Sequence, residues 1–211
     1  MEFEAMVSRQ RAFWNTGATR SVEWRLTQLK KLEQALEERE EALCAALKAD
    51  LGKAAYESWL SEIGMTLGEL RFARKHLKKW AAVKRRPSAM PLFPASSRVV
   101  PQPYGIVLIM SPWNYPVQLT LVPLVSALAA GNCAVVKPSA YAPNVSSVVA
   151  ELLGDIFPPE YVSVVQGGRA ENAALLEQDF DYIFFTGSPA VGKTVMAAAA
   201  QYLTPVTLEL G

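Results

Sequence analysis

Residues 104–137, with the sequence YGIVLIMSPWNYPVQLTLVPLVSALAAGNCAVVK, contain a short apolar run, a longer segment of helical length and a second short apolar run. A strand, a helix and a strand in this order form a βαβ unit, in which the two strands lie parallel. Strands of such a sheet are buried on both faces, so continuous apolar runs are expected in place of strict alternation. Residues 104–137 therefore predict an α/β fold.

The same alternation continues beyond this unit. The expected strands lie at 104–110, 133–137, 162–166, 182–185 and 206–210, and the expected helices at 118–130, 144–153, 169–177 and 189–200. Crossovers between parallel strands are right-handed. The sequence thus predicts a Rossmann-like doubly wound parallel sheet, in which ligands bind at the carboxyl ends of the strands.

The segments before the sheet have a different pattern. Residues 1–86 carry apolar residues three and four positions apart, which predicts helices that pack on the sheet domain. One is expected to begin at a Ser21 or Thr19 cap and to end at Gly52, and another to run from about 56 to 80. Residues 87–103 contain five prolines, which exclude a continuous helix and predict an extended linker or edge arm. Residues 104–211 form the expected α/β core.

The composition excludes several classes of protein. With 21 Lys+Arg against 20 Asp+Glu, the net charge of +1 predicts no global attraction to nucleic acid. His76 is the only histidine, which argues against a zinc site or a Ser-His-Asp triad, and no metal is expected. No signal peptide and no apolar run of about 18 residues is visible, so a cytoplasmic protein without a transmembrane segment is expected.

Two further features have plain explanations. Eight basic residues between 71 and 86 are expected to form the solvated face of a helix, because no aromatic platform for bases accompanies them. Cys44 and Cys133 have neither disulfide-framework nor metal-ligand spacing and are expected to be packing residues.

Residues 187–194, GSPAVGKT, match the phosphate-loop pattern G-x-x-x-x-G-K-[ST] between an expected strand and an expected helix. A triphosphate site would use Lys193 for the phosphates and Thr194 for magnesium, and would normally also need an Asp on a strand. Glu209 is the only acid that follows Thr194. A P-loop nucleotide-binding protein therefore stays as an alternative to a helix N-terminus that faces a dinucleotide pyrophosphate.

Three other segments lie at the ends of expected strands: SPWNYP at 111–116, VVKPS at 135–139 and TLELG at 207–211. Together with FTGS at 185–188, they resemble the aldehyde dehydrogenase superfamily in order and spacing, most closely its class 3 type. The resemblance covers essentially the whole chain. It implies NAD(P)-dependent oxidation of an aldehyde to a carboxylic acid through a Cys thiohemiacetal and thioester.

The resemblance also implies how the cofactor is bound. In the family, the lysine that matches Lys137 binds the adenosine ribose. Family members commonly have a Glu that binds the ribose hydroxyls where this chain has Ala140. Because that carboxylate would repel the 2′-phosphate of NADP, its loss leaves NAD and NADP as equal expectations for the cofactor. The cofactor residues expected on this basis are Ser111, Trp113, Lys137, Ser139, Gly187, Ser188, Val191 and Gly192.

Two residues match catalytic positions of the family. The resemblance implies that Asn114 donates its amide to the oxyanion and that Glu209 activates the water that hydrolyses the thioester. Burial of Glu209 in an apolar strand is expected. The plain alternatives are an Asn114 that closes a turn, and a Lys137 and a Glu209 that are solvated at strand ends.

The family's nucleophilic Cys lies beyond the TLELG motif and matches neither Cys44 nor Cys133. The chain on its own is therefore expected to be inactive, and the full-length protein is expected to act on an aldehyde as a homodimer. A non-catalytic dinucleotide-binding remnant is the second alternative.

Overall fold

A computed structural model describes residues 2–211 and contains a five-stranded parallel sheet. In space the strands follow the order β5-β4-β3-β6-β7, and every neighbouring pair is parallel. Their bounds are β3 (Ile106–Met110), β4 (Cys133–Lys137), β5 (Val162–Val164), β6 (Tyr182–Gly187) and β7 (Val206–Leu210). The strand order reverses at β3, from which the chain builds the sheet outward in both directions, so the doubly wound prediction is confirmed.

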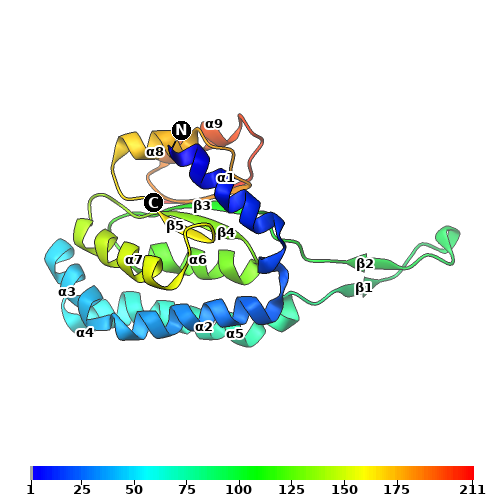
Figure 1. Ribbon diagram of the computed structural model, residues 1–211, viewed down its shortest axis with the longest axis horizontal. Helices are drawn as coiled ribbons and strands as arrows, with labels where there is room; N and C mark the ends of the chain where they lie inside the picture. Colours follow the sequence, from blue (N-terminus) through cyan, green and yellow to red (C-terminus); the bar gives the residue numbers. More distant parts are fainter. Residues whose placement is uncertain (1) are drawn as a thin grey trace.

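Helices cover both faces of this sheet (Figure 1). Helices α6 (Gln118–Ala130) and α7 (Pro143–Ile156) lie on one face, while α8 (Arg169–Leu176), α9 (Pro189–Ala199) and α1 (Glu2–Asn15) lie on the other. β3 and β4 are buried along their whole length, as their uninterrupted apolar runs require. The predicted boundaries differ by a few residues, because β3 begins at Ile106 and β5 ends at Val164.

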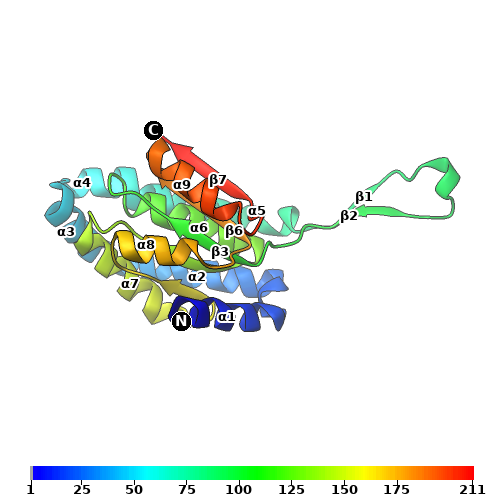
Figure 2. The same ribbon diagram turned by 90° about the horizontal axis from the view of Figure 1, so that it is seen from above.

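The remaining N-terminal helices form a further layer against α6 and α7 (Figures 1 and 2). They are the 3-10 turn η1 (Ala18–Arg20), α2 (Val22–Glu38), α3 (Glu40–Leu51), α4 (Ala55–Ser58), the π-helical turn η2 (Trp59–Ile63) and α5 (Gly64–Trp80). The expected single helix from Ser21 to Gly52 is wrong, because it is broken at Arg39. Arg39 leaves helical geometry, and its guanidinium lies 2.5 Å from Asp155 on α7.

The proline-rich segment belongs to an arm that projects from the body of the molecule (Figures 1 and 2). Strands β1 (Lys84–Arg86) and β2 (Ser97–Val99) pair antiparallel, and the 3-10 turn η3 (Met90–Leu92) lies at the tip. The arm therefore begins before Pro87, within the region expected to be helical. Met90 and Phe93 at the tip are 91% and 86% exposed.

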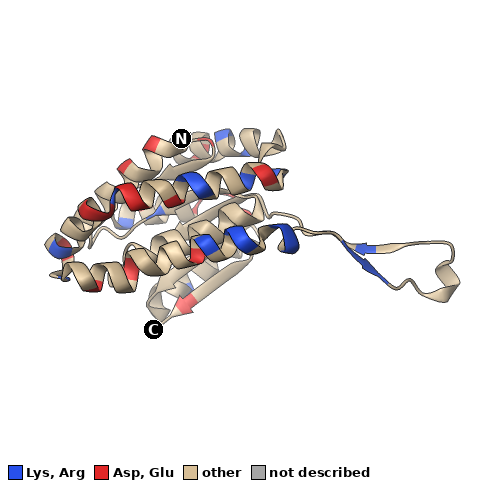
Figure 3. Ribbon diagram, turned by 90° about the horizontal axis from the view of Figure 1, so that it is seen from below, with Lys and Arg blue, Asp and Glu red and all other residues tan. Residues whose placement is uncertain are grey.

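Helix α5 carries several basic residues, coloured blue in Figure 3, and two of them form ion pairs. Arg71 and Arg74 both bind the carboxylate of Glu33 on α2, and Arg71 also binds Glu37 at 2.7 Å. These ion pairs tie α5 to α2. The expected helix face is wrong for Lys84, Arg85 and Arg86, which lie in strand β1 of the arm beyond the end of α5. In residues 2–211, no helix is long and apolar enough to cross a membrane.

Candidate active site

The sequence motifs meet at the carboxyl edge of the sheet. Because Met110 on β3 is paired with Lys137 on β4 and with Phe185 on β6, the loops that follow these strands leave the sheet side by side. β3 and β6 are also the strands between which the chain order reverses. Ligands of doubly wound sheets bind at such a switch point.

An open groove of ≈ 530 Å³ lies at this edge and brings the two catalytic candidates together. Asn114 and Glu209 both line it and are both exposed. The other lining residues are Pro112, Trp113, Thr186, Gly187, Ser188, Leu210 and Gly211. The expected burial of Glu209 is therefore wrong for residues 2–211, because β7 is the outermost strand and pairs only with β6.

A second, narrower pocket of ≈ 270 Å³ adjoins the groove. Ser111 and Phe185 line this pocket, and their chain neighbours Pro112 and Thr186 line the groove, so the two hollows follow one line along the sheet edge. The remaining lining residues include Lys137, Ser139, Ala140, Gly167, Arg169 and Asn172. Together, the two hollows form an elongated site.

Lys137 is buried within this second pocket and is not a solvated strand-end lysine. It is 3% exposed, and its Nζ donates to the carbonyl oxygens of Pro138 at 2.9 Å and Gly167 at 2.7 Å. Burial lowers the pKa of Lys137, and the carboxylate of Glu171 partly offsets this effect. The ammonium group is thus held in one place beside Ser139, whose Oγ accepts from the Tyr141 N–H at 3.2 Å.

Two of the expected cofactor residues, Ser111 and Gly192, have structural roles in the Asn114 loop and in helix α9. The Ser111 hydroxyl is paired with Thr120 Oγ1 at 2.6 Å and is buried, so it fixes the start of the Asn114 loop. A side chain at Gly192 would approach Leu210 Cδ2 to 2.8 Å, which means that this glycine lets α9 pack closely on β7. Trp113 and Val191 are exposed, and Trp113 faces the groove.

The phosphate-loop alternative does not fit the geometry. Helix α9 begins at Pro189, and the Gly192 N–H already donates to the Ser188 carbonyl at 2.9 Å. Ser188 caps the helix by accepting from the Val191 N–H. A P-loop needs its intervening residues in an open loop whose N–H groups face phosphates, whereas here they form the first turn of a helix.

Neither cysteine belongs to the groove. Cys133 is fully buried in β4, and burial raises the pKa of its thiol to about 12. Cys44 lies on α3, where burial and Glu40 raise the pKa of its thiol. A thiol nucleophile needs the opposite shift and an exposed position, so the packing interpretation of both residues is supported.

Three features of the site were missed in the sequence. Asn172 Oδ1 and Thr186 Oγ1 are buried at the two hollows without a hydrogen-bond partner among the described residues. The third is an ion pair between Lys53 and Glu62, which lies against the Asn114 loop. Of these residues, only Thr186 could have been found from the sequence, because it lies in the FTGS motif.

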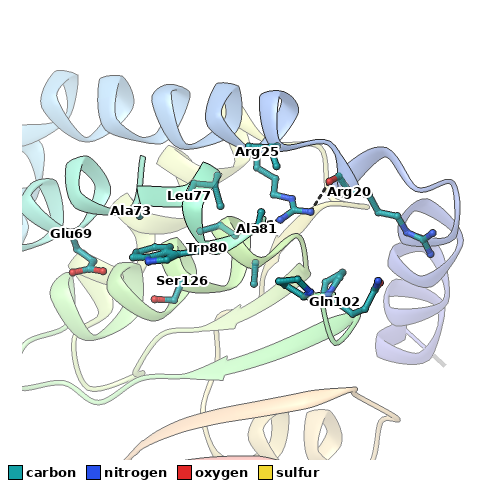
Figure 4. Close-up of a pocket in the computed structure, with 14 residues that line it drawn as sticks. Arg20, Arg25, Glu69, Ala73, Leu77, Trp80, Ala81, Gln102 and Ser126 are labelled. Atoms are coloured by element: carbon teal, nitrogen blue, oxygen red, sulfur yellow. Dashed lines mark hydrogen bonds between the residues drawn. The ribbon is translucent and has the colours of Figure 1, made fainter. Parts of the chain in front are cut away.

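A separate hollow of ≈ 530 Å³ lies among α2, α5, α6 and residues 101–103 (Figure 4). The buried Arg25 lines it, but its guanidinium already donates to the carbonyl oxygens of Thr19, Arg20 and Ala129. Ala129 lies at the end of α6, next to the amino end of β4. This hollow is therefore at the opposite edge of the sheet from the motif residues.

Comparison with known proteins agrees with the motifs. The model of the aldehyde dehydrogenase family matches residues 2–211. Human aldehyde dehydrogenase family 3 member B1 is 49% identical over 203 residues, which cover 96% of this chain and 43% of that protein. The chain thus spans less than half the length of such a curated relative.

Solved structures give the same result. The substrate-bound state of Staphylococcus aureus AldH is 44% identical, with a TM-score of 0.97, and the match covers 99% of this chain and 46% of that one. Betaine aldehyde dehydrogenase (BetB) from Staphylococcus aureus, in complex with NAD+, is 26% identical, with a TM-score of 0.88 and coverage of 98% and 41%. On its sequence, its fold and these matches, the chain belongs to the aldehyde dehydrogenase family.

Proposed function

We propose that the protein containing this chain oxidises an aldehyde to a carboxylic acid with NAD or NADP. The observation that carries this proposal is the single groove in which Asn114 and Glu209 lie together, next to the first turn of α9. Attack on a carbonyl needs a donor for the oxyanion, which an amide supplies. The hydrolysis that follows needs a base for the water, which a carboxylate supplies. The family membership supports the same chemistry.

Asn114 would stabilise the charge on the carbonyl oxygen. Its side chain is exposed in the groove, while its loop is fixed between Pro112 and Pro116. A neutral, preorganised donor favours the oxyanion over the ground-state carbonyl, and removing one such donor lowers the rate by about 10²–10³.

Glu209 would take the proton of the water that releases the acid. Its backbone is fixed by the pairing of β7 with β6, where Glu209 is the partner of Thr186. The nucleophilic thiol would come from residues outside this chain, because Cys133 is buried and Cys44 lies on α3. On this proposal, residues 1–211 alone are inactive.

The elongated site fits a dinucleotide. Lys137 offers a buried ammonium group, and Asn172 Oδ1 and Thr186 Oγ1 are polar atoms without a partner among residues 2–211. We propose that Lys137, Ser139 and Asn172 hold the adenosine ribose, and that Thr186, Gly187 and Ser188 line the path of the pyrophosphate. When bound, the cofactor accepts the hydride of the aldehyde carbon.

The test is the formation of reduced cofactor by the complete protein with short and long aldehydes. Asn114→Ala should lower kcat/KM by about 10²–10³. Glu209→Gln should leave a first, stoichiometric burst of reduced cofactor but slow the steady turnover by about 10²–10⁴, because only hydrolysis is impaired. Glu41→Gln, an exposed carboxylate on α3 outside the groove, should match the parent.

Two results would contradict the proposal. Full activity in both Asn114→Ala and Glu209→Gln would mean that the groove is not where the reaction takes place. Binding of NAD(P) by the complete protein without any turnover would instead favour a dinucleotide-binding remnant.

A further inference from the structure

A buried ion pair from the N-terminal helices lies directly beneath the loop that carries Asn114. Lys53 follows α3, and Glu62 lies in the π-helical turn η2. Lys53 Nζ is 2.6 Å from Glu62 Oε1, and their side chains are 9% and 0% exposed. Two charges withdrawn from water in this way need good geometry to offset their lost solvation.

Both members of the pair contact the loop. Lys53 Nζ donates to the backbone carbonyl of Asn114 at 2.9 Å and lies 4.0 Å from the centre of the Tyr115 ring. Glu62 Oε2 accepts from the N–H groups of Val117 at 2.8 Å and Gln118 at 3.1 Å. The carboxylate thus occupies the N-terminus of α6, where negative charge is favoured.

Every polar group of the pair is used by this arrangement. One oxygen of Glu62 binds the ammonium group and the other binds two backbone N–H groups. The ammonium group has three partners: the carboxylate, the Asn114 carbonyl and the face of Tyr115. Asn114 itself keeps an exposed side chain, so the contacts fix its backbone and leave its amide for a ligand.

The local helix geometry serves the same contact. η2 is a π-helical turn, a form that occurs frequently at functional sites. It requires Gly64, since a Cβ there would lie 2.8 Å from the Trp59 carbonyl oxygen, which accepts the Gly64 N–H. Glu62 lies within this turn and is buried.

We propose that Lys53 and Glu62 are positioning residues that hold the Asn114 amide where the oxyanion forms. This inference rests on the proposed function of Asn114. Apolar residues can often replace a buried ion pair without loss of stability, so stability alone does not account for the pair. What apolar residues cannot supply is the set of bonds to the loop backbone.

The test compares variants of the complete protein. Glu62→Gln and the double apolar variant Lys53→Met/Glu62→Met should each lower kcat/KM for the aldehyde at least about tenfold, because a displaced donor is a poor donor. The dissociation constant for NAD(P) should change by less than about twofold, because the pocket around Lys137 is untouched. The matched control is Glu33→Gln, another buried carboxylate bound by cations, which should lower stability and leave kcat/KM unchanged.

A double-mutant cycle decides whether the pair acts through Asn114. In an Asn114→Ala background, Glu62→Gln should lower kcat/KM by less than about twofold further. Equal losses in both backgrounds, or a fully active Lys53→Met/Glu62→Met protein that folds normally, would overturn the inference. A fully active Asn114→Ala would overturn the proposed role of Asn114.

Hydrogen exchange separates those two failures. Glu62→Gln should speed exchange at the amides of Val117 and Gln118 whether or not Asn114 takes part in the reaction. Unchanged exchange at these amides would refute the positioning role directly. Faster exchange together with a fully active Asn114→Ala would mean that the pair holds the loop but the chemistry lies elsewhere.

Discussion

At the scale of single residues, position 140 controls the charge beside the proposed ribose site. Ala140 lines the pocket with Lys137 and Arg169 and contributes no carboxylate. Ala140→Glu should lower affinity for NADP relative to NAD by about tenfold or more, because a carboxylate there repels a 2′-phosphate. Titration of both cofactors measures this ratio. Ala140→Gln has the same size without the charge, so an equal shift in both variants would argue for shape instead of charge.

A second residue, Cys133, should make stability depend on alkaline pH. Its thiol has a pKa of about 12 in the fold, against a usual value of 9.0, because burial disfavours the thiolate. The folded state then holds its proton more tightly than the unfolded state, so this contribution is complete below pH 9 and is lost as pH rises toward 12. The free energy of unfolding, measured with urea at several pH values between 9 and 12, should fall less steeply with pH in Cys133→Ala than in the parent. The difference should be up to about 1.4 kcal/mol per pH unit. Parallel slopes would contradict the expectation.

At the scale of elements, the π-helical turn before α5 depends on one glycine. Gly64→Ala should destabilise the fold by about 1–3 kcal/mol, since the added carbon meets the Trp59 backbone and something must shift. Gly68→Ala is the matched control in the same helix, where nothing lies within 4 Å of the added carbon. It should stabilise α5 by about 0.5–1 kcal/mol. Similar values for both variants, from chemical denaturation, would show that the turn is not constrained.

At the scale of the whole molecule, residues 2–211 place the motif residues at one edge of the sheet, and neither of their cysteines lines the groove. Expressed alone, the chain should be protected from unfolding by NAD(P), by about 2.7 kcal/mol at a ligand concentration of 100 times Kd. It should form no reduced cofactor with any aldehyde. Thermal unfolding with and without cofactor tests the first part and absorbance the second. Turnover by this chain would place the nucleophile within it, and absence of protection would place essential cofactor contacts elsewhere.

Local sequence patterns predicted the α/β core and the edge of the sheet at which the motif residues lie. The strands β4 and β7 and the helix α6 have their expected bounds, because strand and helix periodicities are local properties of neighbouring residues. The ends of parallel strands lie at one edge of a sheet, so the motifs after β3, β4 and β6 had to meet there once the βαβ pattern was read. This rule explains why Asn114, which follows β3, lines the groove at that edge.

The tertiary structure alone decided the features that depend on distant partners. Lys53 and Asn114 are 61 positions apart, and Glu62 and Val117 are 55 apart, so no local pattern marks their contact. The helix also breaks at Arg39, whose side chain meets Asp155 on α7, a residue 116 positions away. Glu209 is exposed because β7 is the outermost strand, and the order of strands is a property of the assembled sheet. Local spacing fixes which face of an element is apolar, whereas packing decides what that face meets.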